Sequence, residues 1–302
     1  MTAFLRLPWS SRGDHGASQP QDTKLKRIAF AALAALAATS ASAADMAASN
    51  YTKAPAMAAV ASWTGFYAGL NVGYGFNDPV ATFTANDVVS NSIIGNVGTA
   101  ASPVAYDVKG VLGGAQAGYN WQVSPNWLIG FEADFQGSDI KGSAASPYAV
   151  IGRPGQIEAQ QNVEWFGTLR ARAGLLATNK LLVYGTGGFA YGSVREDSIL
   201  SNTIGFTAVA GGGGVSAVCA AAAACYTGPT TKILTGYAVG GGFEYAAWRN
   251  VSLKAEYLYV NLGSSNVTST APATPGTTAS TIGTHFSDLD FHVVRVGANY
   301  HF

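Results

Sequence analysis

From residue 63 onward, apolar and polar residues alternate with a period of two in several separate segments. In residues 65–76, Phe66, Leu70 and Tyr74 lie on one face, whereas Asn71 and four glycines lie on the other. Such alternation predicts a β-strand with one apolar face. The pattern recurs in eight segments, although the two faces of the fifth are hard to tell apart: 65–76, 111–123, 127–136, 162–177, 181–194, 231–245, 250–262 and 291–302.

The charged residues of these segments all fall on the less apolar face. They are Glu132, Asp134, Glu164, Arg170, Arg172, Glu244, Lys254, Glu256 and Arg295. A Lys or Arg facing lipid near mid-membrane costs roughly 2–4 kcal/mol, so a membrane barrel must turn such residues inward. We therefore predict that these nine side chains form a charge network in the barrel lumen. A soluble β-sandwich would instead turn its charged face to water.

The connections between the segments predict the topology. Short turns around residues 124–126, 178–180 and 248–249 alternate with stretches of roughly 20–40 residues. Short periplasmic turns, long outer loops and an even strand count are typical of outer-membrane barrels. The prediction is an all-β fold, an eight-stranded antiparallel up-and-down transmembrane β-barrel over residues 63–302, with both termini in the periplasm. Ten strands stay open, because residues 80–84 and 203–210 are also β-prone.

Several aromatic residues lie close to the short turns or to the end of the last segment. They are Trp63, Trp121, Trp127, Trp248, Tyr300 and Phe302. Amphipathic rings favour the level of the lipid headgroups. We interpret these residues as an aromatic girdle on the periplasmic side.

The N-terminal region is typical of a secretion signal. Residues 24–27 are basic, residues 28–38 are apolar, and Ala41 and Ala43 favour cleavage before Ala44. We predict a signal peptide over residues 1–43 and a periplasmic linker over residues 44–62. Residues 1–23 are polar and lengthen the signal beyond the usual size, which favours a true start at Leu25.

Composition excludes several other classes of protein. Only 11% of the 302 residues are charged, and 37 are glycine. Two of the 17 acidic and five of the 17 basic residues precede Ala44, so the remaining chain carries a formal charge of −3. Because no basic run follows the signal, nucleic acid is excluded as a partner. The glycine runs at 185–187 and 211–214 lack the Lys-Ser/Thr of a phosphate-binding loop, and we expect no cofactor.

Two further clusters are candidates for chemistry. Cys219 and Cys225 enclose five alanines in the third long connection, and export through an oxidising compartment favours a disulfide over two free thiols. Residues 284–292 contain His285, Ser287 and Asp288, the residue types of a hydrolase. Sequence neighbours on one strand alternate in direction, however, so we interpret this segment as a polar rim and predict no enzyme.

Four strings of this sequence resemble the small porin-like outer-membrane β-barrel proteins of alphaproteobacteria. They are residues 63–67 (WTGFY), 184–192 (YGTGGFAYG), 253–259 (LKAEYLY) and 294–302 (VRVGANYHF). The resemblance covers residues 25–302 except the long connections. It implies the Gram-negative cell outer membrane, a role as a surface antigen or envelope component, and reading of Phe302 by the barrel-assembly machinery. It supplies no catalytic residues.

We therefore predict an integral outer-membrane protein with a structural or surface-interaction role, whose partners are outer-membrane lipid and the barrel-assembly machinery. A small-solute diffusion porin is the alternative, and a lipid-modifying enzyme at the rim is a third hypothesis. The sequence does not identify an extracellular ligand. An eight-stranded barrel is just wide enough for side chains to fill its interior, which favours the structural role.

Overall fold

The computed structural model describes residues 63–95, 103–150 and 153–302. The predicted signal peptide, the predicted linker and the proposed start at Leu25 lie outside the described residues. Within the described part of the chain, no helix is long and apolar enough to span a bilayer.

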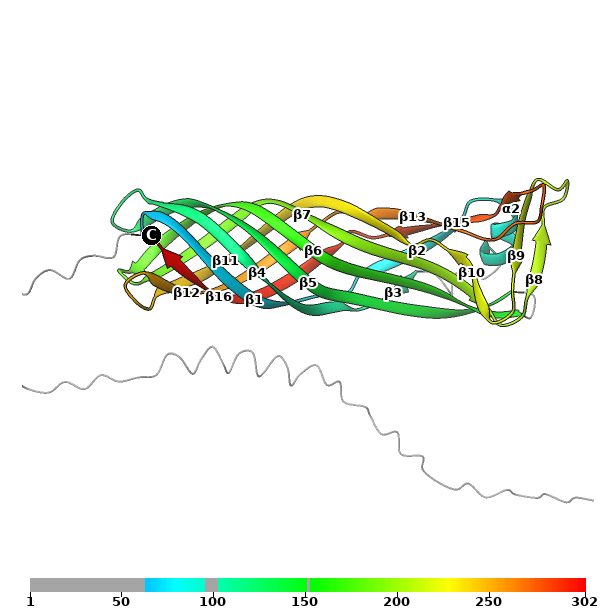
Figure 1. Ribbon diagram of the computed structural model, residues 1–302, viewed down its shortest axis with the longest axis horizontal. Helices are drawn as coiled ribbons and strands as arrows, with labels where there is room; N and C mark the ends of the chain where they lie inside the picture. Colours follow the sequence, from blue (N-terminus) through cyan, green and yellow to red (C-terminus); the bar gives the residue numbers. More distant parts are fainter. Residues whose placement is uncertain (1–62, 96–102, 151–152) are drawn as a thin grey trace, which may run out of the picture. The chain divides into compact units, whose positions relative to one another are not determined.

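Eight long strands form a closed antiparallel ring, as predicted (Figure 1). In ring order they are β1 (Gly65–Asn77), β4 (Val108–Gln122), β5 (Trp127–Val150), β6 (Arg153–Thr178), β7 (Leu181–Asn202), β11 (Thr230–Ala246), β12 (Val251–Asn261) and β16 (Asp290–His301). The ring closes where β16 pairs with β1, from Tyr67 opposite His301 to Phe76 opposite His292. Closure leaves no free strand edge, so the backbone hydrogen bonds of the ring are made within the sheet.

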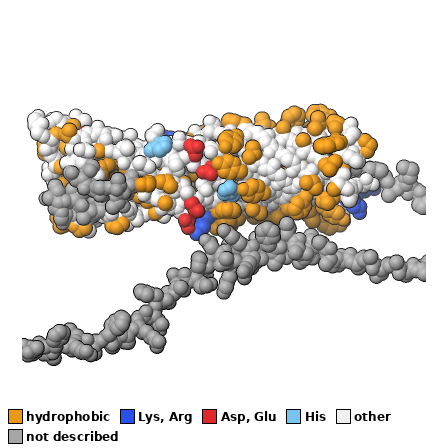
Figure 2. All heavy atoms as spheres, turned by 180° about the vertical axis from the view of Figure 1, so that it is seen from behind, with side chains coloured by type: hydrophobic (Ala, Val, Ile, Leu, Met, Phe, Trp, Pro, Cys, Tyr) orange, Lys and Arg blue, Asp and Glu red, His pale blue; other side chains and the backbone are white. Residues whose placement is uncertain are grey.

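The outer face of the ring is apolar along the half of the strands near the short turns. Phe66 is 65% exposed and Leu70 is 70% exposed, and the predicted outward residues of the other ring strands follow the same pattern. Figure 2 shows these side chains as a broad apolar region on one part of the barrel wall. Exposed apolar surface of this extent is unusual for a soluble protein and is typical of a face that contacts another apolar medium.

Strands β5 and β6 are much longer than predicted, with 24 and 26 residues. The prediction of a long loop between them is wrong, since only residues 151 and 152 separate the two strands. The extra length was missed because outward positions beyond the apolar region are polar. In β6, buried Ile157, Ala159 and Val163 alternate with polar residues that face outward.

The other three long connections contain strands that extend the sheet beyond the ring. From the far end of β7 the order continues through β10 (Ala223–Thr227), β13 (Ser265–Thr270), β15 (Thr281–Phe286), β2 (Val80–Ala85) and β3 (Val104–Ala105). We call these five strands the second tier. The β-prone runs at 80–84 and 203–210 contribute to β2 and β8, not to the ring, which keeps eight strands.

A small separate sheet and a helical segment lie beyond the second tier (Figure 1). The sheet consists of β8 (Phe206–Val209), β9 (Val215–Cys219) and β14 (Thr278–Ala279). The helical segment consists of α2 (Val88–Ser90) and a π-helical turn, η1 (Asn91–Gly95). Asp87 caps α2 by accepting hydrogen bonds from the backbone N–H groups of Val89 and Ser90, both at 2.9 Å.

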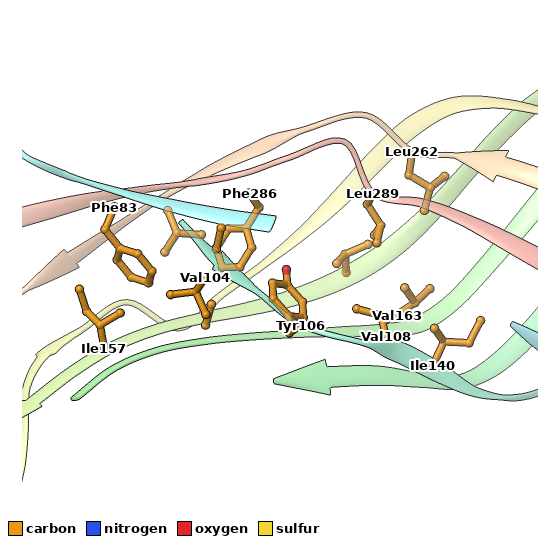
Figure 3. Packing of buried hydrophobic residues seen from close by; sticks show 14 of the residues in the cluster. Phe83, Val104, Tyr106, Val108, Ile140, Ile157, Val163, Leu262, Phe286 and Leu289 are labelled. Carbon is orange, nitrogen blue, oxygen red and sulfur yellow. The ribbon is translucent and has the colours of Figure 1, made fainter. Parts of the chain in front are cut away.

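Apolar side chains fill the space enclosed by the second tier and the far halves of β5, β6 and β7. Figure 3 shows Phe83, Val104, Ile157 and Phe286 from four strands, and Tyr106 from the link between β3 and β4, pointing toward one another. All five are buried. The apolar residues of the long connections are therefore buried in this packed interior and do not need contact with lipid.

We predict that the protein migrates differently on a detergent gel before and after boiling. A closed ring offers detergent no unpaired backbone edge, so the native barrel should resist unfolding until it is heated. The measurement is the mobility of the refolded protein with and without boiling. Identical mobility of the two samples would contradict a closed barrel.

Candidate functional site

Eight charged side chains converge inside the ring, midway along the apolar part of the barrel. The acids are Glu132 and Asp134 from β5, Glu244 from β11 and Glu256 from β12; the bases are Arg170 and Arg172 from β6, Lys254 from β12 and Arg295 from β16. We call these eight residues the lumen cluster. All of them are buried, and the four acids balance the four bases.

Arg170 lies at the centre of the lumen cluster. Its Nη2 is 2.5 Å from Glu132 Oε1 and 2.9 Å from Asp134 Oδ2, and its Nη1 is 3.2 Å from Glu256 Oε1. Its Nε donates to the Thr168 hydroxyl at 2.9 Å. One guanidinium therefore joins carboxylates from two strands that are not neighbours in the sheet.

Arg295 and Lys254 complete the inner part of the cluster. Arg295 donates to Glu256 through Nε at 2.7 Å and to Asp134 through Nη2 at 2.9 Å. Lys254 Nζ donates to both oxygens of Glu132, at 2.6 and 2.7 Å. Because burying a charge costs several kcal/mol, these multiple carboxylate contacts offset the cost of placing each cation inside the barrel.

Arg172 extends the cluster toward the short turns. Its Nη2 is 2.7 Å from Glu244 Oε2, and its guanidinium carbon lies 4.4 Å from the centre of the Tyr184 ring. Its Nη1 donates to the Tyr67 hydroxyl at 2.8 Å, and that hydroxyl donates to Glu132 Oε2 at 2.8 Å. Aromatic faces and a phenol thus complete the surroundings of this cation.

The ninth predicted member, Glu164, is not in the lumen, and this part of the prediction is wrong. Glu164 is exposed, and its Oε2 accepts from the Ser193 hydroxyl at 3.0 Å. A β-bulge causes the difference: Val163 pairs with Val194 and Trp165 with Ser193, so Glu164 has no partner in the register. Val163, just before the bulge, is buried, and so is Phe166, two residues after Glu164.

Neutral polar residues that were not predicted as site residues surround the cluster. Asn299 Nδ2 donates to Glu244 Oε1 at 2.8 Å, and the Ser252 hydroxyl donates to the same oxygen at 2.5 Å. Gln116 Nε2 donates to Asn299 Oδ1 at 2.6 Å, and Asn71 Nδ2 donates to Gln116 Oε1 at 3.0 Å. Their position on the same strand faces as the charges was the signal that could have identified them.

Apolar side chains close the lumen on both sides of the cluster. On the side of the second tier, Phe166 and Phe291 meet edge to face with ring centres 5.3 Å apart. Leu258, which follows Glu256 by two residues on β12, is fully buried. On the side of the short turns, Trp63 packs with Leu128 in a second buried group. The lumen cluster therefore lies between two apolar layers.

Trp63 was expected in the exposed aromatic girdle, and that placement is wrong. It is 3% exposed, whereas Trp121, Trp127 and Trp248 are all well exposed. Its indole Nε1 donates to the backbone carbonyl of Asn179 at 3.3 Å. Trp63 precedes β1, so its side chain folds over the end of the ring instead of following the outward face of the strand.

The residue types typical of a hydrolase do not form a triad in the described part of the chain. His285 Nδ1 lies 3.0 Å from Asn266 Oδ1, and His292 Nδ1 lies 2.6 Å from the Tyr257 hydroxyl. The Ser287 hydroxyl accepts from the backbone N–H of Val80 at 3.1 Å. These polar groups lie around the junction between the ring and the second tier.

Cys219 and Cys225 are joined by a disulfide, with their Cα atoms 4.8 Å apart. The bond connects the end of β9 to β10, and Ala222 between them has a positive φ of 53°. That left-handed residue provides the turn that the short spacing requires. Among the described residues, no group of three or more His, Cys, Asp or Glu side chains is arranged to hold a metal ion.

Comparisons with known proteins give a consistent result. The family model of the outer membrane protein beta-barrel domain matches residues 29–302. The 31 kDa outer-membrane immunogenic proteins of Brucella melitensis and Brucella suis are each 38% identical over 285 residues, covering 92% of this chain and 100% of each relative.

Solved structures of outer-membrane barrels are also similar to this chain. OprG from Pseudomonas aeruginosa is 10% identical with a TM-score of 0.40, and the match covers 79% of this chain and 97% of that one. The outer membrane protease OmpT from Escherichia coli is also 10% identical, with a TM-score of 0.36 and the same coverage of both chains.

We predict that Arg170→Leu destabilises the barrel far more than Lys109→Leu. Removing Arg170 leaves buried carboxylates without their shared partner, which costs about 3–5 kcal/mol. Lys109 is exposed and forms only a 3.5 Å pair with exposed Asp107, so its loss should change the free energy of unfolding by no more than about 0.5 kcal/mol. The measurement is the urea midpoint of each variant refolded in detergent. Equal midpoints would contradict a structural role for the lumen cluster.

Proposed function

The chain belongs to the outer membrane protein beta-barrel domain family, and we propose that it serves the cell envelope as a structural and surface-exposed component rather than as a pore or an enzyme. It is an integral protein of the outer membrane, with 38% identity over 92% of its length to relatives named as outer-membrane immunogenic proteins. An immunogenic protein presents surface to its surroundings, and the second tier supplies such a surface here.

The observation that carries the structural role is the filled interior of the ring. The lumen cluster crosses the barrel from β5 and β6 to β12 and β16 through ion pairs of 2.5–3.4 Å. Apolar layers lie on both sides of it. A diffusion pore needs a continuous hydrated path, and cross-braced charges between apolar layers oppose one.

One observation favours the alternative of a small-solute pore. Asn71 Oδ1, both polar side-chain atoms of Asn120 and both of Gln136 are buried without a hydrogen-bond partner. Buried polar groups of this kind are usually satisfied by water. They support a partly hydrated lumen wall, but the charges and the apolar layers still separate that wall from the two ends of the barrel.

We also propose that both termini lie in the periplasm and that the second tier faces the outside. The three short connections, residues 123–126, 179–180 and 247–250, lie at the same end of the ring as Phe302. Short turns are periplasmic in bacterial outer-membrane barrels, and longer elaborations are external. The second tier extends from the opposite end of β7.

We propose that the protein is not an enzyme. The exposed groups at the rim have partners that do not assemble a nucleophile with a base, as the contacts of His285 and Ser287 indicate. The rival hypothesis of a lipid-modifying enzyme requires activity of the refolded protein on a lipid substrate, and loss of that activity in His285→Ala.

We predict that the refolded protein gives no steady single-channel openings in planar bilayers. The apolar layers and the balanced ion pairs leave no continuous path for hydrated ions. The mobility of the same sample before and after boiling verifies that the barrel is folded, and co-flotation with vesicles of the same lipid verifies that it inserts. Reproducible openings would overturn the structural role in favour of the pore.

We propose that Phe302 is read by the barrel-assembly machinery, and we predict that Phe302→Ala blocks assembly in cells but not folding in detergent. Phe302 is 78% exposed, and its backbone N–H donates to the Phe66 carbonyl at 3.0 Å, a contact that alanine keeps. Losing one exposed ring costs at most a few kcal/mol by burial.

Phe76→Ala is the matched control, because Phe76 is also an exposed aromatic residue, at the far end of β1. The measurements are surface labelling of the second tier in cells and refolding yield in detergent. Normal surface display of Phe302→Ala would refute recognition of this residue, and failed refolding in detergent would assign its effect to stability.

A further inference from the structure

The outer wall of the barrel contains a polar hollow of about 420 Å³ over strands β5, β6 and β7. Its lining includes Lys141 and Ser143 from β5, Gln160 and Asn162 from β6, and Arg195 and Asp197 from β7. The two cations, Lys141 on β5 and Arg195 on β7, lie on either side of Asn162 on the middle strand β6. Nothing in the structural role described above requires this hollow.

The register of the sheet places the cations of this region in one row. Lys109 on β4 is directly opposite Lys141, Lys141 is opposite Asn162, and Asn162 is opposite Arg195. Like charges directly opposite each other in a sheet are destabilising. Lys109 lies outside the lining of the hollow, and the carboxylates of Asp107 and Asp139 offset part of the repulsion between Lys109 and Lys141.

The cations form exposed ion pairs with acids of their own strands. Lys141 Nζ is 2.7 Å from Asp139 Oδ1, and Arg195 Nε is 3.2 Å from Asp197 Oδ2. The side chains of Lys141 and Arg195 are 59% and 53% exposed, and that of Asp197 is 18% exposed, so water screens the Lys141 pair more than the Arg195 pair. Both cations remain accessible to a competing anion.

The hollow lies at the edge of the apolar region of the barrel wall. On the same strands, next to the hollow on the side of the short turns, the Trp165 ring stacks on the Phe135 ring with centres 5.3 Å apart. The centre of the Trp165 ring lies 6.0 Å from that of the Tyr191 ring. On the face that Figure 2 draws, mainly acidic side chains, with some basic and histidine side chains, lie beside the apolar region. Aromatic rings followed by Lys and Arg mark the level of the lipid headgroups in a membrane protein.

We propose that this hollow binds a phosphate group of a phosphorylated lipid headgroup. The Arg195 guanidinium matches the geometry of phosphate oxygens, and Lys141 supplies a second positive charge. Asn162 and Ser143 provide neutral donors between the two cations. The apolar wall adjoining the hollow accommodates the acyl chains of such a lipid, which a free phosphate does not have. The leaflet follows from the orientation proposed above, but binding in detergent does not depend on it.

The test measures lipid binding to the refolded full chain in detergent by native mass spectrometry. The probes are bisphosphorylated lipid A, the same lipid without its phosphates, and inorganic phosphate. The variants are Lys141→Gln combined with Arg195→Gln, which removes both cations, and Asp197→Asn, which removes the competing carboxylate. Lys180→Gln is the control, because Lys180 is an exposed lysine in the short turn between β6 and β7.

We expect the double variant to bind the phosphorylated lipid at least about tenfold more weakly, since it loses two charged donors. Asp197→Asn should bind it a few-fold more tightly, and Lys180→Gln should equal the unmodified protein. Equal binding of the phosphorylated and dephosphorylated lipids, or an unchanged double variant, would overturn the proposal. Competition by inorganic phosphate at the affinity of the lipid would overturn the assignment to a lipid and indicate a site for free phosphate.

Discussion

In the hydrocarbon core of a bilayer, backbone N–H and C=O groups have no water to bind, so each must find a partner within the protein. For strands, that constraint requires a closed ring, and the pairing of β16 with β1 meets it here. Closure then fixes which side of each strand faces lipid. The apolar residues of β1, such as Leu70 and Val72, are outward, and the opposite positions are left to fill a narrow interior.

The narrow interior explains the character of the lumen cluster. Residues that cannot face lipid must pack inside, and with eight strands their side chains meet across the barrel. Arg170 reaches Glu132 and Asp134 on the neighbouring strand β5, and it reaches Glu256 on β12 because the lumen is narrow enough to be crossed by one side chain. The four acids and four bases give the lumen cluster no net charge. Their attraction ties strands that share no backbone hydrogen bonds, which adds cross-bracing to the sheet.

The sequence was sufficient to predict the ring strands and the inward direction of eight of the nine charges, because period-two alternation is strong where one face contacts lipid. It was insufficient where that contrast ends. The outer halves of β5 and β6 were assigned to a loop because Ser143, Gln160 and other polar residues occupy their outward positions. Trp63 precedes β1, so the alternation of that strand does not determine where its side chain points. The second tier depends on pairings between residues far apart in the sequence, such as Ser265 with Phe286 and Ile282 with Ala85.

The misplacement of Glu164 reveals how one strand serves two environments. On β6, odd-numbered residues are the apolar ones on both sides of the bulge: Leu169 and Ala171 toward the short turns, Ile157 and Val163 toward the second tier. Toward the short turns these residues face outward, and toward the second tier they face inward. The single unpaired residue at Glu164 thus reverses the direction of an unbroken apolar pattern. The reversal lies at the charged band, where the medium outside the wall changes from lipid to water, so the same alternation builds a lipid-facing wall on one side and a dry protein core on the other.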